Sequence, residues 1–175
     1  MNAADFRTAM SSLFEPPKVG QPPHWSYWRW ELYQHGLHDD PADFTNWPVV
    51  YHNFLFNHWL NVVDDDYALL QQDWTRWEPV VALPQTGRPS DRYRGGGSSS
   101  ALIHQASHLA RLGPLLGKSI ESLKAITEFG GGFGAMALVA RRAGFQGRYV
   151  IYDFPEMNAL QQYYLAGEDI HGVET

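Results

Sequence analysis

Hydrophobic residues recur every three to four positions through the first 77 residues, a spacing that is typical of amphipathic helices. Four segments carry this pattern: 1–14, 24–36, 46–63 and 67–77. The first segment precedes Pro16 and Pro17, so we predict that its helix ends before this pair. Asn46 is a suitable N-cap for the third helix, on which we expect Trp59 and Val62 to face inward.

Three consecutive carboxylates, Asp64 to Asp66, precede the fourth of these segments. A metal site is one interpretation of such a run. We favour another, in which the carboxylates begin the next helix, because the helix dipole attracts negative charge to that end. His52 and His58 stand six positions apart and fall on different faces of a helix, so we assign them no metal role. The sequence thus predicts no metal site.

All seven tryptophans lie before residue 78, and three of them stand in the segment Trp25-Ser-Tyr-Trp28-Arg-Trp30. Two interpretations of this aromatic cluster stay open. Large aromatic side chains are often buried against a neighbouring element, which is the interpretation we favour. Aromatic rings also suit the apolar faces of sugars, so the cluster could instead form the wall of a carbohydrate site.

Residues 78–100 lack a helical or strand period and are rich in Pro, Gly and Ser, so we predict a long irregular connection. Arg88, Arg92 and Arg94 stand in it, together with Tyr93. These cations could bind an anionic group of a substrate or of the cofactor, since long loops in compact domains are often functional. A solvated linker is an equally good interpretation.

From residue 100 the helical period returns, and we predict a helix from Ser100 to Leu112 that Gly113 ends. His104 and His108 share one face of this helix, four positions apart. No Glu stands between them in the order H-E-x-x-H of a zinc protease. We therefore interpret them as histidines of the surface or of a pocket edge, and a role as catalytic base is the alternative.

The pattern changes after residue 124 to strand, glycine-rich turn, helix and strand. A short apolar strand over 125–129 is followed by three consecutive glycines, Gly130 to Gly132. A helix over 135–143 and a second strand over 148–152 come next, and Asp153 ends that strand. A turn of this kind leaves backbone N–H groups and the positive end of the helix dipole available to a ligand.

Asp153 follows Gly130 by 23 positions and ends the second strand, where a carboxylate can accept hydrogen bonds from ribose hydroxyls. The order of strand, glycines, helix, strand and acid therefore predicts a nucleotide-type cofactor site. Gly130, Gly132 and Ala135 also satisfy the loosened dinucleotide pattern G-x-G-x-x-A, so an NAD(P)-binding oxidoreductase is one alternative. A tight turn with an exposed acid and no ligand is the other.

Two motifs resemble those of class I S-adenosylmethionine-dependent methyltransferases. The motif E-x-G-x-G-x-G, with which the cofactor site of that family begins, is matched by Glu128, Gly130, Gly132 and Gly134. The segment Asp153-Phe154-Pro155-Glu156-Met157 and the run Leu-Gln-Gln-Tyr-Tyr-Leu over 160–165 are similar to the sugar O-methyltransferase family within this class. The close resemblance covers residues 126–165, and Phe154 stands where leucine would be usual.

The resemblance implies S-adenosyl-L-methionine as the cofactor and methyl transfer to a sugar hydroxyl as the activity. It also implies a role for each matching residue. Glu128 would support the first strand and its turn, and the three glycines of the motif would make room for the cofactor. Asp153 would bind the ribose, and Phe154 would pack on the adenine. The acceptor pocket and the opposite wall of the cofactor site would come from later strands, so no catalytic residue is assigned.

The predicted fold class is α/β. An aromatic-rich helical region over 1–77 and the connection over 78–100 precede a helix and the start of a Rossmann-like methyltransferase sheet over 101–175. A sheet of that family has seven strands, and this sequence supplies the first two, so we expect a fragment of a longer enzyme that is inactive alone. We also expect uncovered apolar surface on the second strand and its helix, from Val150, Ile151, Leu160 and Leu165.

Composition excludes some classes of protein. A net charge of −6 argues against a nucleic-acid-binding surface. The absence of cysteine excludes disulfides and thiolate metal sites, and it is compatible with the cytoplasm. No apolar run is long enough for a membrane span, and the first residues lack a signal-peptide core. A sugar or glycan acceptor is the expected partner, and a non-catalytic carbohydrate-binding module that uses the N-terminal aromatics is a further alternative function.

Overall fold

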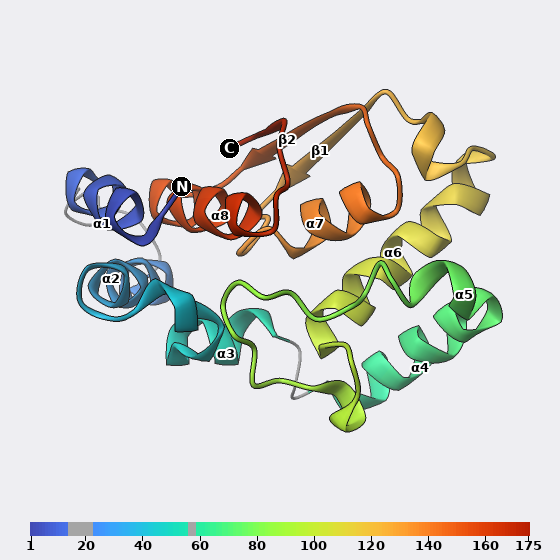
Figure 1. Ribbon diagram of the computed structural model, residues 1–175, viewed down its shortest axis with the longest axis horizontal. Coiled ribbons are helices and arrows are strands. Elements are labelled where there is room, and N and C mark those ends of the chain that lie inside the picture. Colours follow the sequence, from blue (N-terminus) through green and yellow to red (C-terminus); the bar gives the residue numbers. More distant parts are fainter. Residues whose placement is uncertain (14–22, 56–58) are drawn as a thin grey trace.

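The computed structural model describes residues 1–13, 23–55 and 59–175 (Figure 1). The predicted helix stop at Pro16 and Pro17 and the side chain of His58 lie outside the described residues. A helical N-terminal half is followed by a small parallel sheet with helices against it, so the class is α/β in the broad sense. No helix in the described ranges is long and apolar enough to cross a membrane.

The first two predicted helices are confirmed as α1 (Ala3–Ser12) and α2 (Pro23–His38). α1 begins at a capping box, in which the Asn2 side chain accepts from the Asp5 N–H at 2.9 Å and the Asp5 side chain accepts from the Asn2 N–H at 3.1 Å. α2 crosses α1 closely at Gly36, where a larger residue would not fit. A Cβ built on Gly36 would lie 2.6 Å from the Met10 side chain. Met10 is fully buried at this crossing.

The third predicted helix is not continuous. Its segment forms parts of three elements: η1 (Pro41–Asn46), α3 (Pro48–Phe54) and α4 (Leu60–Leu70). The N-cap of α3 is Trp47 and not Asn46, whose side chain bonds to the connection instead. Trp59 is 64% exposed and Val62 is 42% exposed, so the prediction that both face inward is wrong. The residues of α4 that face inward are Val63, Asp66 and Leu70.

The helix predicted from Ser100 begins there but runs past its expected end. α6 (Ser100–Leu116) has Ser99 as its N-cap, and η4 (Ile120–Ser122) follows it. Gly113 stays within the helix, so the predicted stop is wrong. The residue that takes the left-handed conformation at the end is Gly117, with a φ of 61°.

The acidic run also lies differently from its prediction. Asp64 to Asp66 are inside α4 and do not start the next helix, which is split into η2 (Gln71–Asp73) and α5 (Trp74–Trp77). Asp66 is 2% exposed, and its carboxylate forms hydrogen bonds with three side chains of α6. Nδ1 of His104 lies 2.6 Å from it, and Ser107 and Arg111 donate to it at 2.7 Å and 2.9 Å. One buried carboxylate therefore ties α4 to α6.

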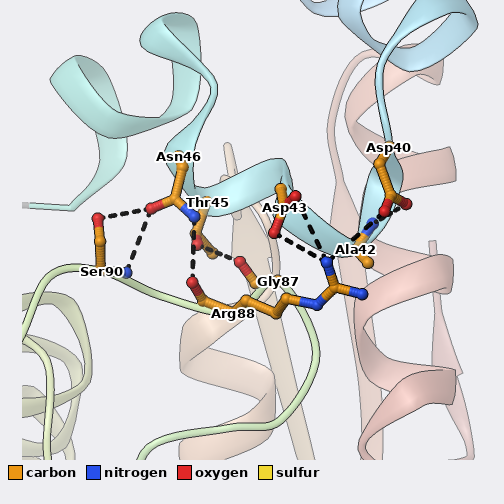
Figure 2. Close-up of polar contacts among 8 residues, drawn as sticks. All are labelled: Asp40, Ala42, Asp43, Thr45, Asn46, Gly87, Arg88 and Ser90. Atoms are coloured by element: carbon orange, nitrogen blue, oxygen red, sulfur yellow. Dashed lines mark hydrogen bonds and ion pairs between the residues drawn. The ribbon is translucent and has the colours of Figure 1, made fainter.

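The connection over 78–100 is held by polar contacts, which does not fit a solvated linker. Figure 2 shows the contacts with η1: the Thr45 hydroxyl donates to the Gly87 carbonyl at 2.6 Å, and the Asn46 side chain donates to the Arg88 carbonyl at 3.0 Å. The Arg88 guanidinium lies 3.3 Å from the Asp43 carboxylate. A short helical turn, η3 (Tyr93–Gly95), precedes α6.

The strand, helix and strand predicted after residue 124 are confirmed as β1 (Ala125–Phe129), α7 (Ala135–Arg142) and β2 (Arg148–Tyr152), and the helix expected after the second strand is α8 (Pro155–Gly167). A short third strand, β3 (Val173–Glu174), pairs parallel with β2, so the expected two strands are corrected to three, in the order β1-β2-β3. α7 and α8 lie on one side of the sheet (Figure 1). Phe129 and Tyr152, which are paired in the register, are exposed on its other face.

One hydrophobic core includes residues from all three predicted regions, 1–77, 78–100 and 101–175. The division of the chain into these regions stays a prediction. Ile151, Leu160 and Leu165 are at most 3% exposed, so the expected uncovered apolar surface is wrong for these three. Ile151 lies under Gly131 and Leu165 lies beside Gly134 of the glycine turn, and α1 and α2 pack on α8 from a distant part of the chain. Val150 is half-buried, on the open face of the sheet.

Candidate functional site

A cavity of about 490 Å³ separates α2 and α3 from the glycine turn and the end of β2. Among the residues that the structure describes, its lining is mostly aromatic and aliphatic and includes the acid Asp153 and the cation Arg29. The lining residues are Trp25, Trp28, Arg29 and Leu32 of α2, Val49 and Phe54 of α3, and Gly130, Gly132, Tyr152, Asp153, Phe154 and Met157 of the second half. Sites for small organic ligands have this size and this mixture of apolar walls and few polar groups.

The glycine turn between β1 and α7 adopts the left-handed backbone that its sequence predicts. Gly130, Gly132 and Gly134 have φ angles of 71°, 54° and 96°. The Gly130 N–H donates to the Tyr152 carbonyl at 2.9 Å, which fastens the turn to the end of β2. A Cβ on Gly130 would meet nothing within 4 Å, whereas one on Gly134 would lie 3.5 Å from Leu165. Gly130 and Gly132 therefore line the cavity, and Gly134 faces α8 instead.

Asp153, after the last residue of β2, is bound to the turn. Its Oδ1 accepts from the Phe154 N–H at 2.8 Å, and its Oδ2 accepts from the Gln161 side-chain amide at 3.1 Å. The same amide nitrogen donates to the Gly132 carbonyl at 2.7 Å, so Gln161 joins the acid to the turn. Burial raises the pKa of Asp153, and these donors, with the N–H groups of Gly131 and Gly132, oppose the rise by favouring the charged form.

Glu128 lies beneath the turn and does not line the cavity. Its Oε2 accepts from the Tyr149 hydroxyl at 2.8 Å. A Cβ on Gly131 would come within 3.2 Å of the Glu128 carboxyl carbon and 2.6 Å of Ile151. Position 131 therefore requires glycine where the turn crosses β1 and β2. Burial raises the pKa of Glu128, the Tyr149 bond lowers it, and the negative charge of Asp153 raises it further. Glu128 therefore supports the turn from the side of β1.

Phe154 forms the side of the cavity next to α8, where it meets two side chains of α2. Its ring centroid lies 5.8 Å from that of Trp25, and the guanidinium carbon of Arg29 lies 4.8 Å from the Phe154 centroid. Arg29 also donates two hydrogen bonds, at 3.1 Å and 2.8 Å, to the buried carboxylate of Glu156. Because paired bonds of this kind have a specific geometry, they fix α2 against α8.

The wall opposite the glycine turn comes from the N-terminal helices. Trp25 and Trp28 of α2 line it, and Phe54 of α3 lies 3.3 Å from the place of a Cβ on Gly132. Helices thus form the opposite wall of this cavity, and the expectation that later strands supply the opposite wall of a cofactor site stays a prediction. This wall also changes the interpretation of the tryptophan cluster, because Trp25 is 38% exposed and faces the cavity and is not buried in the core. The alternative of a carbohydrate wall stays open.

Sequence reasoning missed Arg29 and Gln161, two residues that hold the site together. Arg29 stands inside the tryptophan cluster, and Gln161 stands among the apolar residues of α8. Gln161 is fully buried, and the carboxylate that Arg29 binds is 4% exposed. A polar residue that shares an apolar helical face is the signal that would have identified both.

The cations of the connection do not reach the cavity. Arg94 lies 2.9 Å from Asp64, to which the Tyr93 hydroxyl also donates, and Arg88 bonds to η1. Arg92 is exposed and does not line the cavity. The expectation that these arginines bind an anionic group of the ligand therefore finds no support at this cavity. Within the ranges that the structure describes, no three His, Asp or Glu side chains are placed to hold a metal ion.

No protein-family model, curated protein or solved structure matches this chain. The family resemblance of the glycine turn and of the Asp-Phe-Pro segment is therefore an inference from these motifs. What the chain does has to be argued from the cavity and its residues.

Proposed function

We propose that this chain binds S-adenosyl-L-methionine and carries the cofactor-binding part of an O-methyltransferase that acts on a sugar hydroxyl. One observation carries the proposal. A single cavity joins Gly130, Gly132, Asp153 and Phe154, which are four of the six cofactor-binding residues that the motifs imply. Of the other two, Glu128 supports the turn from the side of β1, and Gly134 belongs to the turn and faces α8. A Rossmann-like methyltransferase fold, limited to its first strands, and a cytoplasmic location are parts of the same proposal.

The lining residues fit the parts of this cofactor. Gly130 leaves open space where a ligand can approach the backbone closely. Asp153 can accept hydrogen bonds from ribose hydroxyls, and the ring of Phe154 offers an apolar face to an adenine base. When bound, the cofactor supplies an electrophilic methyl group. The part of the protein residues is to hold donor and acceptor in a fixed relative position.

The acceptor side of the site is formed by α2. Trp25 and Trp28 stand edge to face, with ring centroids 5.0 Å apart and an angle of 82° between their planes. Such rings pack well on the apolar faces of sugars, so we place the acceptor along this helix. No residue is proposed as general base.

Calorimetric titration of the full chain with S-adenosylhomocysteine and with NADH tests the proposal. We expect S-adenosylhomocysteine to bind, Asp153→Ala to weaken this binding, and Asp65→Ala, a change of an exposed acid on α4, to leave it unchanged. Binding of NADH alone would replace the proposal by a nicotinamide-dependent oxidoreductase. Sugar binding that needs no nucleoside ligand and survives Asp153→Ala would indicate a carbohydrate-binding module, the function that Trp25 and Trp28 also favour.

A further inference from the structure

A second cavity, of about 370 Å³, is formed where the connection over 78–100 meets α4, α5 and α6. Its lining includes Tyr67, Trp74, Glu78, Tyr93, Arg94 and Gly97. None of the described residues that line it also lines the cavity of the candidate site. A Cβ built on Gly97 would meet no atom within 4 Å, so the loop leaves a ligand room at this position. The second cavity is therefore a separate candidate binding site.

Three aromatic rings lie next to one another in this lining. The Tyr67 ring contacts both of the others: its centroid is 5.2 Å from that of Trp74, at an angle of 71°, and 5.2 Å from that of Tyr93, at 51°. Tyr93 is 6% exposed, and Tyr67 and Trp74 are half-buried against the hydrophobic core, so packing holds the rings in place. Because the face of an aromatic ring is negatively polarised, adjacent rings attract a cation placed among them.

Arg94 places a cation at one of these rings. Its guanidinium carbon lies 5.5 Å from the centroid of Tyr93, and its Nη2 lies 2.9 Å from the carboxylate of Asp64. The Tyr93 hydroxyl donates to the same carboxylate. The Arg94 backbone is left-handed, with a φ of 50°, a conformation that residues other than glycine rarely adopt and that surrounding contacts must hold. A ring and a carboxylate thus bind a guanidinium beside the second cavity.

Negative charge exceeds positive charge around the second cavity. Among the described residues that line it, Glu78 and Arg94 are charged, and the charge of Arg94 is balanced by its partner Asp64. The carboxylate of Glu78 is therefore the charge that a ligand meets. Over the few ångströms of a cavity this carboxylate attracts a cation and repels an anion. A ligand with one positive charge would complete the balance.

We propose that the second cavity binds an organic cation whose head is an alkylated ammonium group. Such a head carries its positive charge among alkyl groups and has few or no N–H donors, so ring faces suit it better than hydrogen-bond acceptors do. Tyr67 and Trp74 provide the ring faces, and Glu78 provides the opposite charge. The site goes beyond the proposed function and does not depend on it, because the two cavities have different linings.

Choline and 3,3-dimethylbutan-1-ol have the same shape and differ in charge, so they are the probes that test the site. Calorimetry measures the affinity of the full chain for each at one pH and salt concentration. We expect choline to bind tighter by about tenfold or more. In Glu78→Gln, which keeps the shape and removes the charge, this ratio should fall to about threefold or less. Asp65→Asn, on an exposed acid of α4, is the matched control and should leave the ratio unchanged.

The rings are tested by Trp74→Leu, which should lower the affinity for choline by about fivefold or more. Choline that does not bind at millimolar concentration, or the neutral alcohol binding as tightly as choline, would overturn the proposal. So would a choline affinity that Glu78→Gln and Trp74→Leu both leave unchanged, since the cation would then bind elsewhere. Methyl glucoside that binds where choline does not would reassign the cavity to a carbohydrate. The comparison of the two probes needs no variant, so a misfolded Trp74→Leu leaves the test intact.

Discussion

The side-chain amide of Gln161 donates to the carboxylate of Asp153 at 3.1 Å, across eight positions of sequence. Gln161 belongs to the helix that covers the sheet, and Asp153 follows the strand whose end borders the cavity. The bond therefore couples the packing of α8 to the polar group that we expect to contact a ligand. A change at either residue should be measurable in ligand binding.

Replacement of Asp153 by alanine should weaken binding of S-adenosylhomocysteine by a factor of tenfold to a few hundredfold. A hydrogen bond to a charged group contributes about 1.5–3 kcal/mol, and about 1.4 kcal/mol corresponds to a factor of ten. Asp153→Asn should lose less, because its amide can still bond to one hydroxyl. Calorimetry measures both affinities, and equal affinities in the variants and the unaltered chain would remove Asp153 from the site.

Ligand affinity should rise with pH through the titration of Asp153. Burial raises the pKa of this carboxyl, and hydroxyl donors of a ligand bond best to its charged form, so affinity is low below the raised pKa and levels off above it. Gln161→Met removes a donor that favours the charged form and should move the rise to higher pH. A titration series between pH 4 and 8 shows both effects. Asp153→Asn should remove the dependence, and a dependence that persists would show that a group other than Asp153 is responsible.

A leucine at Gly130 should abolish ligand binding, whereas the same change at Gly95 should not. Both glycines have nearly the same backbone, with φ angles of 71° and 70°, and neither has an atom within 4 Å of a built Cβ. The two variants therefore share a conformational cost of about 1–2 kcal/mol. Only Gly130 lines the cavity, so only Gly130→Leu fills it. Equal losses of affinity in the two variants would show that backbone strain, and not the cavity, is responsible.

Gly132→Val should both destabilise the turn and reduce binding. Its φ of 54° disfavours a branched side chain, and a Cβ there would lie 3.3 Å from the Phe54 ring of α3. Because the clash is with α3, we expect a lower thermal midpoint in addition to the lost affinity. Circular dichroism during heating measures the first and calorimetry the second. A variant that binds S-adenosylhomocysteine as well as the unaltered chain would contradict the position of the cavity.

Removal of the Asp66 carboxylate should lower the free energy of unfolding by about 2–4 kcal/mol, because Asp66→Ala removes an acceptor that His104, Ser107 and Arg111 share. Asp65→Ala, one position away and exposed, should change it by no more than about 0.5 kcal/mol. Denaturation in urea measures both. If the two variants unfold at the same urea concentration, the network between α4 and α6 contributes nothing.

The same carboxylate should make stability depend on pH. Burial alone would raise the pKa of Asp66, but the bonds from His104, Ser107 and Arg111 outweigh it and hold the pKa below its ordinary value. The contribution of Asp66 is therefore fully present above the ordinary pKa of an aspartate, about 3.9, and is lost as the pH falls through the lower folded value. Asp66→Ala should show less loss of stability than the unaltered chain over that acidic range.

The second half of the chain was the easier one to predict, for a physical reason. The glycines of the turn, the β-branched and aromatic residues of β2 and the proline at the start of α8 act on their own backbone, so their effect is readable locally. The order of elements and the place of Asp153 at the end of a strand followed from these local preferences.

The helix boundaries between residues 46 and 77 were not readable in this way, because apolar spacing does not say which face meets the core. The helical spacing of apolar residues predicted one helix in which Trp59 and Val62 are buried. The structure has two helices there, α3 and α4, and both residues are exposed. α4 turns a different face inward, and Asp66 takes a buried place on it because α6 supplies three donors to its carboxylate. Those donors are about 40 positions away in sequence.

Sequence alone established the glycine turn, the acid that faces it and the strands and helices that hold them, because each depends on residues close together in the chain. Tertiary structure decided what lies across the cavity. Arg29 and Glu156 are 127 positions apart, and their bonds bring the tryptophans of α2 to the end of β2. Such a contact depends on how whole helices pack, which no local pattern encodes. For that reason the glycine-turn side of the cavity was predictable, and the aromatic wall opposite it was not.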